Sequence, residues 1–308
     1  MSNTQPPNRP APDYQSLIDP PTWEFIRATE AAYPPDTAQM TIAAQRQIYD
    51  TMCQSFHAGT PPGVLACDEQ VAGVLCRRYP GTGPVVIYFH GGGFVVGGLH
   101  SHDDICAEIC ATTGLTVLAA DYRLCPEHPH PAAYADCLAV ARATPGPILL
   151  AGDSAGGALA AAVAASFRDP RLLGQVLIYP SLGGHSDSHQ RHANAPMLSA
   201  ADVAFYARMR GADPDDPTAN PLMALDFTGL PLTLAIAAEC DPLADDAAAY
   251  AAHITAAGGQ AQAITELGLV HGYLRARHSV PRARASFDRL TATLAAFARG
   301  QWPFGDTT

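Results

Sequence analysis

Lysine is absent from this chain of 308 residues, so every basic side chain is an arginine or a histidine. Charged residues make up only 15% of the chain, and acidic residues outnumber basic ones by 29 to 18, for a formal net charge of −11. Such an acidic surface repels phosphate backbones and anionic lipid heads, so neither nucleic acid nor a membrane is an expected partner. It also disfavours anionic substrates at long range, an effect that a local arginine could reverse.

Long apolar runs and paired cysteine motifs are also missing. No stretch approaches the roughly 20 uninterrupted apolar residues of a membrane span. The proline-rich first residues have neither the apolar run nor the charge pattern of a signal peptide. The eight cysteines form no Cys-x-x-Cys pair, and a chain of this size needs no disulfide framework. We therefore expect a soluble, cytoplasmic protein with mostly reduced, buried thiols.

Short apolar runs alternate with longer alanine-rich segments along most of the chain. Two short runs come first, at 63–67 and 71–78, and could pair as antiparallel strands. Further strands are predicted at 85–89, 116–120, 148–151, 175–179, 232–238 and 263–267. Helices are predicted at 104–113, 132–143, 155–167, 245–257 and 283–298. This alternation predicts an α/β fold with a mostly parallel central sheet and helices on both of its faces.

Two regions depart from the alternation and are predicted to form a helical cap. Residues 1–60 supply N-terminal cap helices, and residues 181–230 form a loop-rich cap or lid inserted between two core strands. The core is then built from residues 61–180 and 231–308. Because α/β sheets place their sites at the carboxyl ends of the strands, we expect the inserted segment to cover a site there.

The strongest motif is Gly152-Asp153-Ser154-Ala155-Gly156, which directly follows a predicted strand and directly precedes a predicted helix. A G-x-S-x-G sequence between strand and helix is typical of a nucleophile elbow, a turn so tight that only small residues can flank the serine. The helix N-terminus beneath the hydroxyl favours developing negative charge. The alternative is a chance glycine- and serine-rich helix start. We expect Ser154 to be a nucleophile.

A second motif, His90-Gly91-Gly92-Gly93-Phe94, directly follows the predicted strand 85–89. Three consecutive glycines let backbone amides approach a substrate oxygen without obstruction by side chains. This HGGG form is the usual oxyanion-hole partner of a nucleophile elbow, although a glycine triplet alone is more often a flexible turn. We expect the amides of Gly91, Gly92 and Gly93, with that of Ala155, to stabilise a tetrahedral oxyanion.

A catalytic acid and base are expected in the chain order Ser, then Asp or Glu, then His. Asp241 follows the predicted strand 232–238, and His271 follows the last predicted strand. His271 would act as the general base, and Asp241 would orient its ring. Glu239 and Asp245 are alternative candidates for the acid, but the proline after Asp241 marks a turn off the strand.

Together these motifs resemble the hormone-sensitive-lipase family of α/β hydrolases. Residues 121–129 (DYRLCPEHP) are similar to a family segment that usually has alanine where this chain has Cys125. Residues 220–222, 241–245 and 271–273 match later family blocks, and the resemblance covers roughly residues 65–300. It implies the α/β-hydrolase fold, a helical cap and no cofactor. It also implies that His90, Asp153 and Glu127 support the elbow from outside the triad.

The expected function is hydrolysis of short-acyl carboxylic esters, small molecules selected by the cap and by Phe94, Val95, Phe205 and Leu222. A homodimer is the expected oligomer, because dimers are the commonest soluble homo-oligomers. One alternative is C–N cleavage, as in arylformamidase-like relatives, although the third glycine of HGGG argues against it. The other is a ligand receptor similar to the gibberellin receptors, which lack the catalytic histidine.

Two groups of polar side chains have the composition of metal sites. They are His100, His102, Asp103 and Asp104, and His185, His189 and His192. Both groups lie in glycine-flanked loops or at helix starts, and a serine triad needs no metal. We therefore interpret them as solvated or helix-capping residues and predict no metal site.

Overall fold

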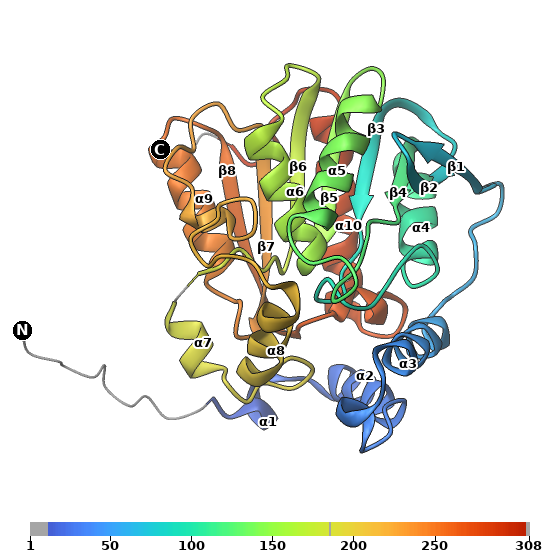
Figure 1. Ribbon diagram of the computed structural model, residues 1–308, viewed down its shortest axis with the longest axis vertical. Helices are drawn as coiled ribbons and strands as arrows, with labels where there is room; N and C mark the ends of the chain where they lie inside the picture. The colour runs from blue at the N-terminus through green and yellow to red at the C-terminus, as the bar shows by residue number, and fades with distance from the viewer. Residues whose placement is uncertain (1–11, 185, 306–308) are drawn as a thin grey trace, which may run out of the picture.

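The computed structural model describes residues 12–184 and 186–305 (Figure 1). One eight-stranded sheet crosses the molecule in the order β1-β2-β4-β3-β5-β6-β7-β8. Its strands are β1 (Cys67–Val71), β2 (Val74–Tyr79), β3 (Thr82–Phe89), β4 (Leu115–Ala120), β5 (Ile148–Asp153), β6 (Leu172–Ile178), β7 (Leu232–Cys240) and β8 (Ala261–Val270). β2 is antiparallel to both β1 and β4, and every other neighbouring pair is parallel. The predicted mostly parallel α/β sheet is therefore confirmed.

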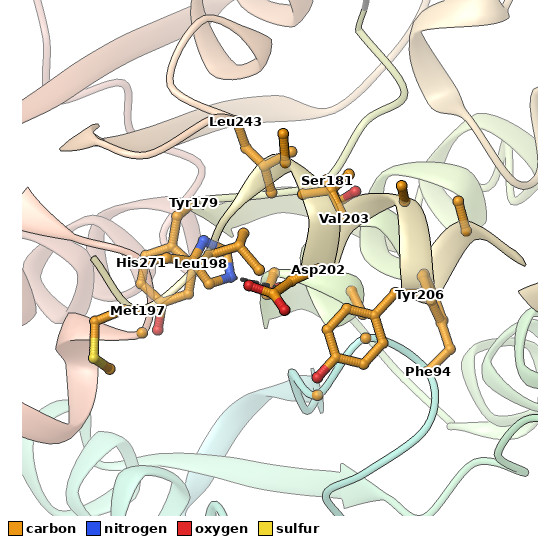
Figure 2. Close-up of a pocket in the computed structure, with 18 of the residues that line it drawn as sticks. Phe94, Tyr179, Ser181, Met197, Leu198, Asp202, Val203, Tyr206, Leu243 and His271 are labelled. Carbon is orange, nitrogen blue, oxygen red and sulfur yellow. Dashed lines mark hydrogen bonds between the residues drawn. The ribbon is translucent and has the colours of Figure 1, made fainter. Parts of the chain in front are cut away.

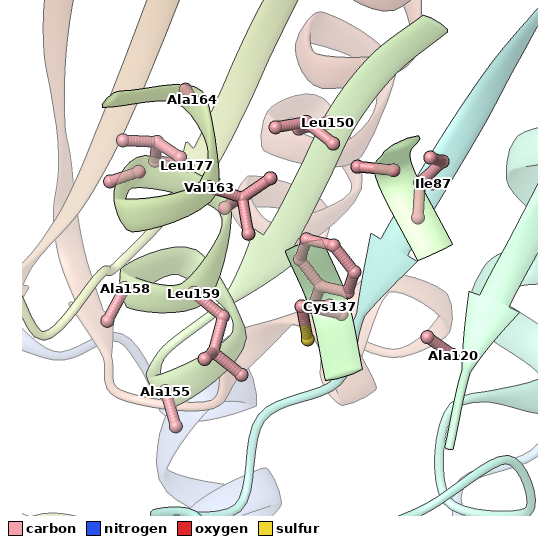
Figure 3. Close-up of a cluster of buried hydrophobic side chains, with 14 of the residues drawn as sticks. Ile87, Ala120, Cys137, Leu150, Ala155, Ala158, Leu159, Val163, Ala164 and Leu177 are labelled. Atoms are coloured by element: carbon pink, nitrogen blue, oxygen red, sulfur yellow. The ribbon is translucent and has the colours of Figure 1, made fainter. Parts of the chain in front are cut away.

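Helices cover both faces of the sheet, as predicted. They are α4 (Asp103–Thr113), α5 (Ala132–Ala143), α6 (Ala155–Ser166), α9 (Asp246–Ala256) and α10 (Pro281–Phe297). Alternate residues of each strand enter two separate cores: Ile87 and Leu150 pack with α5, α6 and α9, whereas Val86 and Leu149 pack with α4 and α10. Figure 3 shows part of the first core, which contains Leu159 and Val163 of α6 and Leu150 of β5. Burial on both faces explains why these strands are continuous apolar runs.

The predicted hairpin exists, but its first strand was misplaced. Residues 63–66 lie outside the sheet, and β1 begins at Cys67 and pairs with β2 through Val71 and Val74. The two-residue turn between them, Ala72 and Gly73, has φ values of 50° and 83°. Two consecutive positive φ values are the geometry that matches the twist of paired strands, and this turn sets the register. The expectation was wrong because Ala72 is an unusual residue for such a turn.

The segments predicted to form a cap contain short helices at one end of the sheet. The N-terminal ones are α1 (Tyr14–Leu17), α2 (Pro20–Ala31), the 3-10 helix η1 (Thr37–Gln39) and α3 (Ile42–Ser55). Between β6 and β7 lie α7 (Asp187–Arg191), α8 (Ala200–Arg210) and the 3-10 helix η2 (Pro221–Met223). Figure 1 shows α1, α2, α3, α7 and α8 below the sheet, at the end to which the β3 arrow points. The carboxyl ends of the parallel strands therefore face these helices.

Within residues 12–184 and 186–305, no helix has both the length and the apolar character needed to cross a membrane. Seven of the eight cysteines are buried and Cys67 is exposed; none of them is in a disulfide. The last short element, the 3-10 helix η3 (Tyr273–His278), follows β8 and leads into α10.

Candidate active site

Ser154, His271 and Asp241 form one hydrogen-bonded chain at the carboxyl ends of β5, β8 and β7. The Oγ atom of Ser154 lies 2.8 Å from Nε2 of His271, and Nδ1 of His271 lies 2.6 Å from Oδ2 of Asp241. The three residues are separated by 87 and 30 positions in the sequence (154 to 241, 241 to 271). The carboxyl ends of parallel strands lie at the same edge of a sheet, and this topology brings the three side chains together.

The two supporting side chains are held from several sides. Asp241 is fully buried, and its Oδ1 accepts a hydrogen bond of 2.9 Å from the amide of Leu243. The His271 ring packs against Tyr179, with ring centroids 4.8 Å apart. The alternative acids are engaged elsewhere, because Glu239 accepts from the amide of Gly268 and Asp245 from that of Ser188. Of the three carboxylates considered from the sequence, Asp241 is the one bonded to the imidazole.

Ser154 occupies a strained turn between β5 and α6. Its φ of 55° and ψ of −118° are unfavourable for a residue with a side chain. Its amide donates to the carbonyl of Ile178 at 2.9 Å, which ties the turn to β6. The turn also needs Gly156, because a Cβ there would overlap the carbonyl oxygen of Phe89 at the end of β3. The sharp turn and the close approach at Gly156 explain why the residues on both sides of the serine must be small.

The four amides predicted to form an oxyanion hole are not equivalent. The amide of Gly91 donates to Oδ1 of Asp153 at 3.0 Å, so it is already committed within the protein. The amides of Gly92, Gly93 and Ala155 donate to no acceptor in the part of the chain that the structure describes. All three residues line the cavity that also contains Ser154. These three N–H groups are thus available to an oxygen atom placed beside the serine.

Asp153 supports the glycine loop from beneath the elbow. Its carboxylate accepts from the Tyr88 hydroxyl at 2.9 Å as well as from Gly91, and His102 Nε2 lies 3.2 Å from it. Burial alone would raise the pKa of Asp153, but His102, with help from Arg275 and Tyr88, holds it well below its usual value. An anion fixed in this way orients the loop that carries the free amides.

His90 and Glu127 lie near the same loop but are engaged differently. The His90 ring stacks on Tyr122 with centroids 4.2 Å apart, and burial lowers its pKa to about 3. Glu127 is exposed and forms a two-pronged ion pair with Arg46 of α3, whose guanidinium also donates to the carbonyl of Val95. Arg46 therefore connects α3 both to Val95, just after the glycine loop, and to Glu127 at the surface.

A cavity of about 780 Å³ opens over Ser154 and His271. Figure 2 shows Tyr179 and His271 on the sheet side, with Val203 and Tyr206 of α8 facing the same space. Thr29 and Tyr33, together with Tyr49 and Met52 of α3, add further lining from the N-terminal region. The wall is mostly apolar, and the polar groups of the Ser154 turn occupy its floor, an arrangement typical of small-molecule sites.

Only part of the predicted substrate pocket lies on this wall. Phe94 lines the cavity, whereas Val95 is fully buried in the core beneath it. Phe205 and Leu222 are not among the described residues that line the cavity; Phe205 packs edge-on against Tyr206, and Leu222 packs against the core. On a helix, adjacent residues point about 100° apart, so Tyr206 faces the cavity and Phe205 does not.

Several lining residues carry no motif in the sequence. Tyr179 follows β6, and its position at a strand end was a usable signal that pointed to the same edge of the sheet. Tyr49 and Tyr206 come from helices whose orientation over the sheet depends on tertiary packing. Arg275 lies four residues after His271, in a stretch where arginines are common and no motif distinguishes this one.

Several of the residues that resembled metal ligands form ion pairs or hydrogen bonds, whereas His100 is exposed, as predicted. His102 is buried beside Asp153, and Asp104 is buried against Arg277, so the expectation that they are solvated or capping was wrong. His192 is also buried and bonds the Tyr14 hydroxyl at 3.1 Å, while His185 lies outside the described residues. The described part of the chain holds no group of three His, Cys, Asp or Glu side chains arranged to bind a metal. Their partners came from distant segments, which local spacing does not reveal.

Known proteins resemble this chain over most of its length. A family model described as the α/β-hydrolase fold matches residues 86–275. The esterase LipI of Mycobacterium tuberculosis is 38% identical over 273 residues, which cover 80% of this chain and 85% of LipI. The carboxylesterase NlhH of the same species is 38% identical over 234 residues, 68% of this chain and 73% of NlhH. The Pyrobaculum calidifontis esterase structure is 29% identical, with a TM-score of 0.82 over 91% of this chain and 99% of that one.

Proposed function

We propose that this chain, which belongs to the α/β-hydrolase fold family, is a serine carboxylesterase that hydrolyses short-acyl carboxylic esters through an acyl-enzyme on Ser154. The observation that carries this proposal is the chain of hydrogen bonds from Ser154 Oγ through His271 to Asp241, which opens onto the cavity beside three unpaired amides. The relatives described above are named for ester hydrolysis and not for C–N cleavage, so we favour esters over amides as substrates.

In the first step Ser154 Oγ attacks the ester carbonyl carbon while His271 Nε2 accepts the hydroxyl proton. The resulting imidazolium is stabilised by Asp241, which stays ionised and holds the ring through Nδ1–H. When the tetrahedral intermediate collapses, His271 returns the proton to the alkoxy oxygen and the alcohol leaves. The acyl group remains on Ser154.

The negative oxygen of that intermediate needs hydrogen-bond donors that are already in place. The amides of Gly92, Gly93 and Ala155 suit this role, because they face the cavity and donate to no acceptor among the described residues. Each such donor typically contributes about 3–4 kcal/mol to transition-state stabilisation. Gly91 instead holds the loop in place through Asp153.

In the second step water takes the place of the alcohol. His271 accepts a proton from water as its oxygen attacks the acyl carbon, and then returns that proton to Ser154 Oγ, releasing the carboxylic acid. The overall change is one ester and one water to one acid and one alcohol, with the enzyme unchanged. No redox partner is required.

Short acyl groups are the substrates that we favour. The ethyl acetate hydrolase of Pseudomonas putida is 34% identical over 215 residues, which cover 63% of this chain and 67% of that protein. A cavity of about 780 Å³, lined by Tyr49, Tyr206 and Met197 among others, has the size of a small-molecule site. We propose that residues 1–60 and 181–230 act as the cap, since α2, α3 and α8 supply much of this lining.

We further propose a cytoplasmic location and a homodimer. Eight cysteines without a disulfide, seven of them buried, fit a reducing compartment. Light scattering of the purified protein measures the oligomeric state directly.

The Ser154→Ala variant tests the function. We expect kcat/KM for p-nitrophenyl butyrate to fall by about 10⁴-fold or more, because the alanine cannot form the acyl-enzyme. Ser166→Ala is the matched control, since Ser166 lies at the far end of α6 from Ser154 and is not among the cavity-lining residues. It should retain activity and labelling by a fluorophosphonate probe. Wild-type turnover by the Ser154→Ala protein would rule out this nucleophile.

A further inference from the structure

A buried arginine lines the cavity close to the ester-binding groups. Arg275 lies in η3, four residues after His271, and only 9% of its surface is exposed. It belongs to the same cavity wall as Ser154, His271 and Gly272. The turn that supplies the imidazole therefore also supplies a permanent positive charge, because an arginine stays protonated in proteins.

The direct partners of Arg275 carry no charge. Its Nε donates to the Cys53 thiol at 3.1 Å, and its Nη2 donates to the Tyr49 hydroxyl. Burial raises the pKa of Cys53 and raises that of Tyr49 well above its usual value, so both groups are neutral near pH 7. The Tyr49 ring also lies 5.1 Å from the guanidinium carbon. Among the described residues, no carboxylate lies within ion-pair distance of Arg275, and its Nη1 donates to no acceptor.

None of the acidic side chains near the cavity forms an ion pair with Arg275 among the described residues. Asp153 contributes to the field at Arg275, but its oxygens already accept from Tyr88 and Gly91 and lie beside His102. Asp202 accepts from the amide and hydroxyl of Ser199 at the start of α8 and is exposed, as is Glu30. Neither forms an ion pair with Arg275.

The two other buried arginines have different partners. Arg277, which is 1% exposed, pairs with both Asp104 and Glu108. Arg210 also lines the cavity and forms no ion pair among the described residues. Its guanidinium carbon lies 3.9 Å from the centre of the Phe94 ring, and Nη1 donates to the carbonyl of Ala219. Burial lowers the pKa of Arg210 to about 10, so Arg210 is the less favourable place for a permanent charge. A buried cation is costly unless an anion or several acceptors pair with it. Arg275 lines the cavity, and the hydrogen bonds to Cys53 and Tyr49 use its Nε and Nη2 and leave Nη1 for a ligand.

We propose that Arg275 binds a carboxylate of the substrate, so that the preferred esters carry a free carboxylate a few bonds from the scissile group. This inference rests on the proposed esterase function and names its substrate class. A guanidinium presents parallel N–H groups that match a carboxylate, and the match is strongest away from bulk water. It also supplies the local attraction that an enzyme with a net charge of −11 needs to bind an anion.

The wild-type enzyme provides the first test. Ethyl hydrogen glutarate and ethyl glutaramate differ in a terminal carboxylate or amide of nearly equal size, and their hydrolysis at pH 7.5 can be followed by pH-stat. A second pair, 3-acetoxypropanoate and 3-acetoxypropanamide, places the charge on the alcohol side. We expect kcat/KM to be at least tenfold higher for the anion in one of the two pairs. Equal or faster hydrolysis of the neutral ester in both pairs would overturn the inference.

The Arg275→Met variant assigns the preference to this side chain. We expect the ratio of kcat/KM for the anionic ester to that for its neutral partner to fall at least tenfold. Arg275→Lys keeps the charge without the planar fork and should give an intermediate ratio. Arg299→Met is the matched control, because Arg299 is exposed, lies outside the cavity and changes the net charge equally. An unchanged ratio in Arg275→Met would overturn the assignment.

Inhibition of the wild type keeps the inference testable if Arg275→Met does not fold. Glutaramate, with one carboxylate, should inhibit p-nitrophenyl butyrate hydrolysis with a KI at least tenfold below that of glutaramide, which has none; equal KI values would overturn the inference. Absence of p-nitrophenyl butyrate turnover by the wild type would instead contradict the esterase function itself. The two failures are therefore distinguishable.

Discussion

A buried carboxyl group next to Asp241 makes stability depend on pH at the scale of a single residue. Asp246 is fully buried at the start of α9, and its Oδ2 accepts from the amides of Leu182 and Gly184. Burial raises the pKa of Asp246 to about 7, and the nearby Asp241 and Asp245 act in the same direction. Its other oxygen, Oδ1, has no hydrogen-bond partner among the described residues. Below about pH 7 the protonated form of Asp246 therefore predominates in the folded state.

The Asp246→Asn variant should remove this pH dependence. In the wild type between about pH 4 and 7 the folded state holds a proton that the unfolded state has lost, so stability falls as pH rises. Asparagine cannot ionise. We therefore expect the free energy of unfolding of Asp246→Asn, relative to wild type, to rise by up to about 1.4 kcal/mol per pH unit over this window. Urea unfolding at pH 5, 6 and 7 measures it, and a constant difference would contradict the assignment.

At the scale of elements, backbone strain is concentrated where strands end at the cavity. Phe94, Ser154, Tyr179 and Met197 have φ values of 65°, 55°, 35° and 73°, and all four line the cavity. Such conformations cost energy and persist only where the surrounding packing enforces them. Here β3, β5 and β6 hold the first three. The sheet thus stabilises turns that aim side chains and amides into one space.

The close packing of α6 against the end of β3 predicts that a glycine-to-alanine substitution in this helix destabilises the protein, opposite to the usual effect. Replacing a helical glycine by alanine usually stabilises a helix by about 1 kcal/mol. A Cβ at Gly156 would overlap the Phe89 carbonyl oxygen, and β3 leads directly into the glycine loop. We expect Gly156→Ala to lower the free energy of unfolding by roughly 1–3 kcal/mol, the usual cost of overpacking, and to reduce kcat. Denaturant unfolding and p-nitrophenyl butyrate kinetics test both, and a stabilised variant would contradict the close packing.

At the scale of the whole molecule, an ion-pair network connects the turn after β8 to two helices. Arg277 of η3 bonds Asp104 and Glu108 of α4, each at 2.6 Å, and Glu108 also pairs with Arg284 of α10. Burial would raise the pKa of Glu108, but hydrogen bonds from Arg277 and Arg284 lower it instead. The segment that carries His271 and Arg275 is therefore anchored on its far side.

Glu108→Gln should weaken that anchor in a pH-dependent way. We expect a loss on the order of 2 kcal/mol at pH 7, because Glu108 is partly solvated and Asp104 still pairs with Arg277. A lowered folded-state pKa contributes stability above the unfolded-state value near pH 4.5, and this contribution is lost as pH falls further. Urea unfolding at pH 7 and pH 3.5 should therefore show the gap between variant and wild type closing at low pH. A gap of equal size at both values would contradict it.

Much of the molecule could be predicted because its signals are local. The elbow around Ser154 and the glycine loop after β3 are short turns whose geometry demands particular residues, and alternating apolar and alanine-rich runs indicate strands and helices. The hairpin at β1 was placed four residues early because Ala72 gives no turn signal. The local sequence predicts solvated or capping roles for His102 and Asp104, and it cannot show their partners, Asp153 and Arg277, which lie far away along the chain.

The amino-acid sequence by itself determined the order of strands and helices, the elbow, and the identity of the serine, histidine and carboxylate candidates, since each depends on neighbours within a few residues. Only the tertiary structure decided that the Gly91 amide donates a hydrogen bond to Asp153. It also decided that Tyr206 rather than Phe205 lines the cavity, and that Arg275 lines it without a carboxylate partner. These features depend on how helices settle on the sheet, which is set by side-chain packing between segments distant along the chain.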